Sequence, residues 1–158
     1  MLRLKSAPRA PDLVQIEEDA RRLALELAGM MPAGFVDVMR RGLVLEPGER
    51  AWREVSVELR HRVGGSWTPG ISSMALVTDR RVLLKTIDGR VLSLWWGSLV
   101  GFEPRLSSGY VVLDYGDGAP RLLSGRQVSS IAVVGVAALY GVEALTTHPA
   151  LERLRARS

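Results

Sequence analysis

The sequence lacks cysteine altogether, which excludes disulfide bonds, thiol nucleophiles and thiolate-bound zinc. Histidine is nearly absent too, and His61 and His148 each lie in a stretch without a patterned carboxylate or metal-ligand partner. No Gly-Lys-Ser/Thr phosphate loop and no nucleophile–base arrangement is present. We therefore expect a non-enzymatic protein with no metal, no cofactor and no small-molecule substrate.

Long apolar runs are also missing. The most apolar segment, residues 131–142, is well short of the ~20 residues that a helix needs to cross a bilayer. The first residues are basic, but no apolar stretch follows them as it would in a secretory signal. These features favour a cytoplasmic location, with peripheral contact to a membrane surface as an alternative.

Basic residues outnumber acidic ones, and this excess is spread evenly along the chain. The chain of 158 residues has a formal net charge of +4, and 47% of its residues are hydrophobic, an ordinary balance for one globular domain with a modest extension. Nucleic-acid-binding domains usually concentrate their basic residues on one face. Because the excess here is distributed along the chain, nucleic acid is an unlikely partner and an anionic partner is only mildly favoured.

The N-terminal third predicts a tail and two helices. Residues 1–11 contain two prolines and are expected to be disordered, and residues 12–42 form a helical extension. Asp12 can cap the first helix, and a short second helix is expected over residues 33–41. The first helix carries a heptad-like apolar stripe, which either docks on its own domain or mediates self-association. The candidate self-association residues are Leu13, Ile16, Leu23, Leu27 and Met30.

From residue 51 onward, apolar residues recur at every second position, which is the period of a strand. Val55, Val57 and Leu59 share one face of a half-buried strand, and about seven short strands follow one another, separated by tight turns such as Asp88-Gly89. An apolar helix then begins, with Ser124 and Gln127 at capping-box spacing. It is apolar nearly all round and is expected to be buried, and residues 148–158 follow as a basic tail.

Several motifs carry a family resemblance. "LEPGER", "ALVTDRRVLL", "SLVGFE", "GYVVLDYGDG" and "SGRQVSSIAVVGVAALYG" resemble bacterial pleckstrin-homology-like (PH-like) and GRAM-type domains over about residues 45–141. The resemblance implies a mainly β (α+β) fold at residues 43–147. That fold is a bent antiparallel barrel of about seven strands, capped by a long C-terminal helix and here preceded by the two N-terminal helices.

This resemblance implies a fold and leaves the function open, because the superfold serves many functions. Relatives that bind phosphoinositides place a lysine before the first hairpin loop and an Arg-x-Arg after it. Here the Arg-x-Arg, Arg60 and Arg62, precedes the loop. The polar step Thr78-Asp79-Arg80-Arg81 is interpreted first as a hairpin turn. The candidate anion-binding residues are Arg60, Arg62, Trp67, Arg80, Arg81 and Lys85.

The function that these observations favour is a protein-interaction or self-assembly module, with a protein partner or a second copy as its ligand. The apolar stripe, the open strand edges of a bent barrel and the lack of site chemistry support it. The alternative is peripheral binding to a membrane or an anionic phospholipid headgroup. Nucleic-acid binding is weaker still, because only one of the adjacent Trp95 and Trp96 can face outward for base stacking.

Overall fold

The computed structural model describes residues 12–155, so the tail predicted for residues 1–11 lies outside the described residues. The longer helices are α1 (Leu13–Leu27) and α2 (Val128–Tyr140), and α3 (Glu152–Arg155) is a single turn. The strands are β1 (Ala51–Val63), β2 (Ser66–Trp67), β3 (Ile71–Thr78), β4 (Arg81–Thr86), β5 (Val91–Trp95), β6 (Gly101–Arg105), β7 (Tyr110–Asp114) and β8 (Arg121–Ser124).

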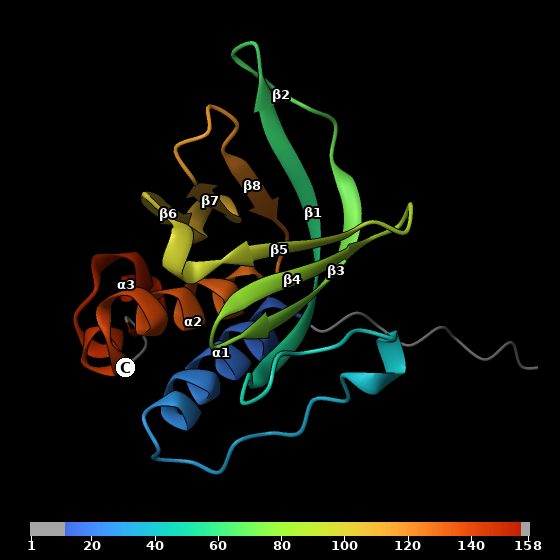
Figure 1. Ribbon diagram of the computed structural model, residues 1–158. Coiled ribbons are helices and arrows are strands. Elements are labelled where there is room, and N and C mark those ends of the chain that lie inside the picture. Colours follow the sequence, from blue (N-terminus) through green and yellow to red (C-terminus); the bar gives the residue numbers. More distant parts are fainter. Residues whose placement is uncertain (1–11, 156–158) are drawn as a thin grey trace, which may run out of the picture.

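All strand pairs in the described chain are antiparallel, in the order β5-β4-β3-β1-β8-β7-β6, with the short β2 folded back on the end of β1. The long strand β1 belongs to both halves of the sheet (Figure 1). Its residues 51–59 pair with β3, and its residues 58–61 pair with β8. The expected α+β fold dominated by antiparallel strands is confirmed.

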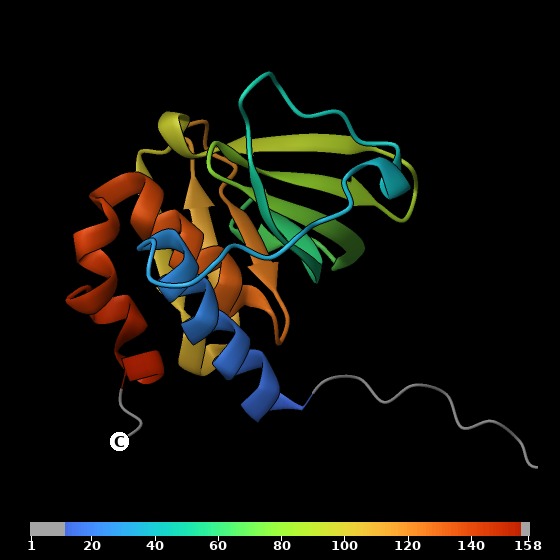
Figure 2. The same cartoon turned by 90° about the horizontal axis from the view of Figure 1, so that it is seen from below.

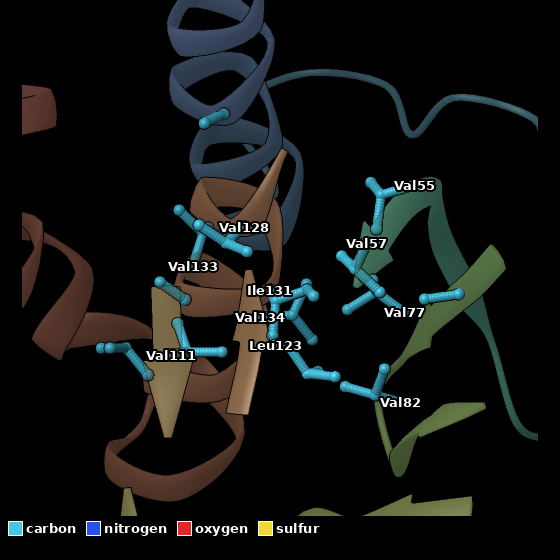
Figure 3. Close-up of a cluster of buried hydrophobic side chains, with 14 of the residues drawn as sticks. Val55, Val57, Val77, Val82, Val111, Leu123, Val128, Ile131, Val133 and Val134 are labelled. Carbon is cyan, nitrogen blue, oxygen red and sulfur yellow. The ribbon is translucent and has the colours of Figure 1, made fainter. Parts of the chain in front are cut away.

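The core lies between the sheet and helix α2 (Figure 3). Val55, Val57 and Leu59 alternate into it along β1, as their spacing predicts, and each is buried. Val77 of β3 and Leu123 of β8 meet the same cluster from the two halves of the sheet. Period-two patterning therefore places one continuous apolar surface on the inner side of the sheet.

Helix α2 is buried along residues 128–136, as its apolar circumference predicts. The expected capping box is wrong. The helix begins only at Val128, and the side chain of Gln127 accepts a hydrogen bond from the backbone N–H of Ser56 (2.9 Å) instead of capping the first turn. The side-chain amide of Gln127, which the local spacing predicted to cap the helix, therefore bonds to strand β1 instead.

Helix α1 packs beside α2 at one end of the sheet, and α3 packs against α1 (Figure 2). The Asp12 cap is confirmed, since its carboxylate accepts a hydrogen bond from the backbone N–H of Gln15 (2.8 Å). Ala20 and Leu23 of α1 enter the same core cluster as Leu154 of α3. Among residues 12–155, no helix is long and apolar enough to cross a membrane.

The second N-terminal helix predicted at residues 33–41 is wrong, because the structure has only a 3-10 turn there, Met39–Arg41. Residues 34–45, called the strap below, instead run largely extended across the outer face of β3 and β4 (Figure 2). The inward-facing apolar residues of the strap pack on Met74, Leu76 and Leu83 of the two strands; they are Val36, Val38, Leu43 and Leu45. This second, smaller apolar cluster overrides the helical spacing of Phe35, Val38 and Met39, because the extended strap buries Leu43 and partly buries Val36, Val38 and Leu45 against the outer face of the sheet.

Candidate functional site

The Thr78-Asp79-Arg80-Arg81 step is a tight turn between β3 and β4, as predicted. The hydroxyl of Thr78 accepts hydrogen bonds from the backbone N–H groups of Arg80 (3.1 Å) and Arg81 (2.9 Å). The carboxylate of Asp79 accepts one from the backbone N–H of Arg50 (2.9 Å) at the start of β1. Short polar side chains thus satisfy the backbone of the reversal.

Arg81 points inward from this turn. Its guanidinium forms a bidentate pair with Glu49, with Nε to Oε2 at 2.9 Å and Nη2 to Oε1 at 2.8 Å. The Glu49 side chain is fully buried and that of Arg81 is 10% exposed. Further hydrogen bonds run from Arg81 to Ser93 Oγ (2.8 Å) and the carbonyl of Val44 (3.3 Å), and the ring of Trp95 lies 4.5 Å from the guanidinium carbon. The internal contacts occupy every nitrogen of this arginine.

Glu49 should make the stability of the protein depend on pH. Burial alone would raise the pKa of Glu49. Hydrogen bonds from Arg81 and Thr78 lower it by more than burial raises it, so the pKa ends below its ordinary value of 4.5. A depressed folded-state pKa contributes stability that is full above pH ~4.5 and is lost as pH falls through the folded value. We expect the melting temperature to fall below that pH, and Glu49→Gln to flatten the fall. Parallel pH profiles for the two proteins, measured by circular dichroism, would contradict this role.

The remaining predicted anion-binding residues do not form one cluster. Arg80 pairs with Glu46 (3.0 Å), and the Lys85 ammonium donates to the carbonyl of Arg41 (3.2 Å). The guanidinium of Arg60 donates to Glu58 Oε2 and to Ser124 Oγ, both at 2.9 Å.

Arg62 and Trp67 lie together at the far end of β1, where they are paired in register and the guanidinium carbon is 5.9 Å from the ring centroid. Ala51, at the other end of β1, pairs with Thr78 of the Thr78–Arg81 turn, called the arginine turn below. At ~3.3 Å per residue, about 35 Å of strand separates the two ends. This arrangement divides the candidates among three places, so they do not form one flat anion-binding surface.

The predicted self-association stripe is largely covered within the molecule. Leu23 is fully buried, Ile16 is 7% exposed and Leu27 is half-buried against the core. Leu13 and Met30, at the two ends of the stripe, are 44% and 73% exposed. Of the two interpretations left open by the sequence, docking of this helix on its own domain is the one that the structure contains.

The most exposed large apolar side chains on the N-terminal side of β1 were missed by the sequence analysis. Phe35, Met39 and Val44 of the strap are 90%, 85% and 84% exposed. The helix expected over residues 33–41 would place Phe35, Val38 and Met39 together on one side. A signal was present: "GFVDVM" places apolar residues at odd and even positions alike, so an extended chain buries one set and exposes the other.

Comparison with known proteins leaves the chain without a family. No family model matches it, and no curated protein does. Among solved structures, the C-terminal domain of an unknown protein from Leishmania infantum aligns with 78% of this chain and 96% of its own length, at 9% identity and a TM-score of 0.40. That likeness is too low to support a fold or a function. Within residues 12–155, no group of three or more histidine and carboxylate side chains could hold a metal ion.

Proposed function

We propose that the protein is a non-catalytic interaction module built on a PH-like domain, and that it binds a protein partner through the strap. The observation that carries this proposal is the exposure of Phe35, Met39 and Val44 along one segment. Exposed large apolar side chains that gather on one surface are typical of protein-binding sites. The PH-like assignment is supported by the strand order, in which β1 joins the three strands β3–β5 to the three strands β6–β8 ahead of one apolar helix.

The strap is fixed in place, which favours binding because little conformational entropy is lost on association. Its start is tied down by a hydrogen bond from the backbone N–H of Gly34 to Glu26 (2.8 Å). At its turn, Arg40 and Arg41 both pair with Glu54 of β1, at 3.3 Å and 2.6 Å. The outward-facing residues are therefore presented by a held backbone.

The chemistry beside the strap indicates the kind of partner. The side chains of Arg40 and Arg41 remain 63% and 43% exposed, and Lys85 of the neighbouring strand is exposed. These basic groups border an apolar segment, so the best-matched partner surface is an apolar pocket with acidic residues at its rim. A second copy of the chain is the alternative occupant, and the oligomeric state distinguishes the two.

The strap residues should matter for binding and not for folding. We expect the free energy of unfolding of the double variant Phe35→Asp, Met39→Asp to lie within about 0.5 kcal/mol of that of the wild type, since both side chains are solvent-exposed. A photo-reactive phenylalanine placed at position 35 should form a defined adduct with a protein partner in the source cells, and Met39→Asp should remove that adduct.

The matched control is the same photo-reactive residue at Val100, which is 71% exposed in the connection before β6. Light scattering of the purified protein shows whether the adduct is a second copy. Equal adducts at positions 35 and 100, or no adduct at either position together with a monomer at all concentrations, would contradict the proposal.

A further inference from the structure

The two halves of the sheet differ in what lies over their outer faces. The strap covers the outer face of β3 and β4, whereas a groove of about 480 Å³, called the β6–β8 groove below, stays open over the outer face of β6, β7 and β8. The groove lies on the β8 side of β1 and the strap on its β3 side (Figure 1). Because the strap is held by Glu26 and Glu54, it does not reach the groove of its own molecule.

The floor of the β6–β8 groove is apolar. The residues before and after Val112 on β7 are buried in the core, so Val112 points outward, where it lies in register with Leu122 of β8. Tyr110 lies two residues before Val112 on the same face, and Trp67, which is 38% exposed, lines the groove from the side of β1. Aromatic side chains on an accessible apolar surface are typical of protein interfaces.

The charged residues of the β6–β8 groove are mainly acidic. Glu103 of β6 is the cross-strand neighbour of Val112, and Asp114 of β7 lines the groove beside it. Glu103 pairs with Arg105 (2.6 Å), but both side chains are more than half exposed, and such a pair contributes little. Arg62 also lines the groove, on the far side of β8 from the two carboxylates. The groove is therefore an apolar floor with acidic residues along one rim.

The strap has the complementary properties. Phe35 and Met39 point outward and are 90% and 85% exposed, and the side chains of Arg40 and Arg41 beside them are 63% and 43% exposed. We infer that the strap of one molecule docks in the β6–β8 groove of the next, with its apolar side chains on the floor and its guanidinium groups at the acidic rim. This inference rests on the proposed function and names its partner as a second copy of the chain.

The contact joins two different surfaces, so it leaves a free strap at one end of the assembly and a free groove at the other. Such a head-to-tail contact produces open chains, or a ring where the rotation between copies closes. Mutual pairing of two straps would instead stop at a dimer. The assembly should therefore grow as the protein concentration rises.

The test is the mass of the purified full-length protein, measured by light scattering over a range of concentrations. The strap variant Phe35→Asp, Met39→Asp keeps an intact groove, and the groove variant Val112→Lys keeps an intact strap. We expect the wild-type mass to rise with concentration, and each variant alone to lose at least about tenfold in affinity and remain a monomer. An equimolar mixture of the two variants should form a 1:1 dimer and nothing larger, because it contains only one working strap–groove pair.

Two further variants separate assembly from folding. Glu103→Lys changes only the rim of the groove, where the side chain is 54% exposed, so it tests the groove even if Val112→Lys is unstable. Val14→Lys is the matched control, since Val14 lies on α1, is 45% exposed and belongs to neither surface. It should assemble as the wild type does, and circular dichroism shows that each variant is folded.

Three results would overturn the inference: a wild type that is monomeric at all concentrations, groove variants that still assemble, or mixed variants that stay monomeric. In each of these cases a photo-adduct from position 35 to a different protein would leave the proposed function intact, with another partner at the strap. A monomeric wild type without any adduct would remove both.

Discussion

Replacing Glu49 with alanine should lower the free energy of unfolding by about 3–5 kcal/mol, the range found when one partner of a buried ion pair is removed. Glu49 is fully buried beneath the arginine turn and holds Arg81 through two hydrogen bonds. Without it, Arg81 keeps its charge in a site that gives water little access. Urea unfolding at neutral pH measures the loss, and a cost under about 1 kcal/mol would contradict the geometry described.

The double variant Glu49→Met, Arg81→Met is the control for this prediction. It removes both charges together, and apolar replacement of a whole buried pair is often neutral or stabilising. We expect it to be clearly more stable than Glu49→Ala. A double variant as unstable as the single one would show that the turn depends on the ion pair for its conformation.

The second large effect should come from Trp96. Replacing it with alanine should cost about 3–5 kcal/mol, as for other large-to-small changes in a core. The ring is 3% exposed, its centroid lies 5.8 Å from that of Phe102 in an edge-to-face contact, and its indole N–H donates to the carbonyl of Thr78 (2.9 Å). A methyl group on Gly135 of α2 would lie only 3.0 Å from this ring, so the packing around it is tight.

Trp95→Ala is the matched control, because it deletes the same side chain one residue earlier. Trp95 is half-buried and its ring lies beside Arg81 on the other side of the strand. We expect a loss of about 1 kcal/mol, mostly from the cation–π contact. Chemical denaturation of the two variants gives the comparison, and equal costs would show that both rings are structural.

The strands and the long helices were predictable because their signals are local. Alternation at Val55, Val57 and Leu59 already specifies which face of β1 is buried, and the Asp12 cap marks the start of α1 through a residue that lies nearby in the sequence. The apolar helix that was expected to run up to residue 148 ends instead at Tyr140. The arginine turn was recognised for the same reason, since Thr78 and Asp79 bond to the backbone of the reversal itself or of the adjoining strand.

The strap and the Glu49–Arg81 pair were not predictable, because their energies come from distant partners. Glu49 lies in a loop that the sequence marks only as polar, 32 residues before Arg81. Leu43 is buried only because Leu76 and Leu83 present an apolar outer face on β3 and β4. A distant partner also decides the role of Gln127, whose side chain bonds to Ser56, 71 residues earlier, and not to its own helix.

Helix α1 and several of the residues that it contacts lie at opposite ends of the described sequence. Ala20 and Leu23 share a core with Leu151 and Leu154, and the guanidinium Nε of Arg21 donates to the carbonyl of Leu154 (2.6 Å), 133 residues away. During synthesis on the ribosome, the apolar side of α1 therefore stays uncovered until nearly the whole described chain has been made. Contacts of such long sequence separation slow folding, and the newborn chain is most open to aggregation or to chaperones in that interval.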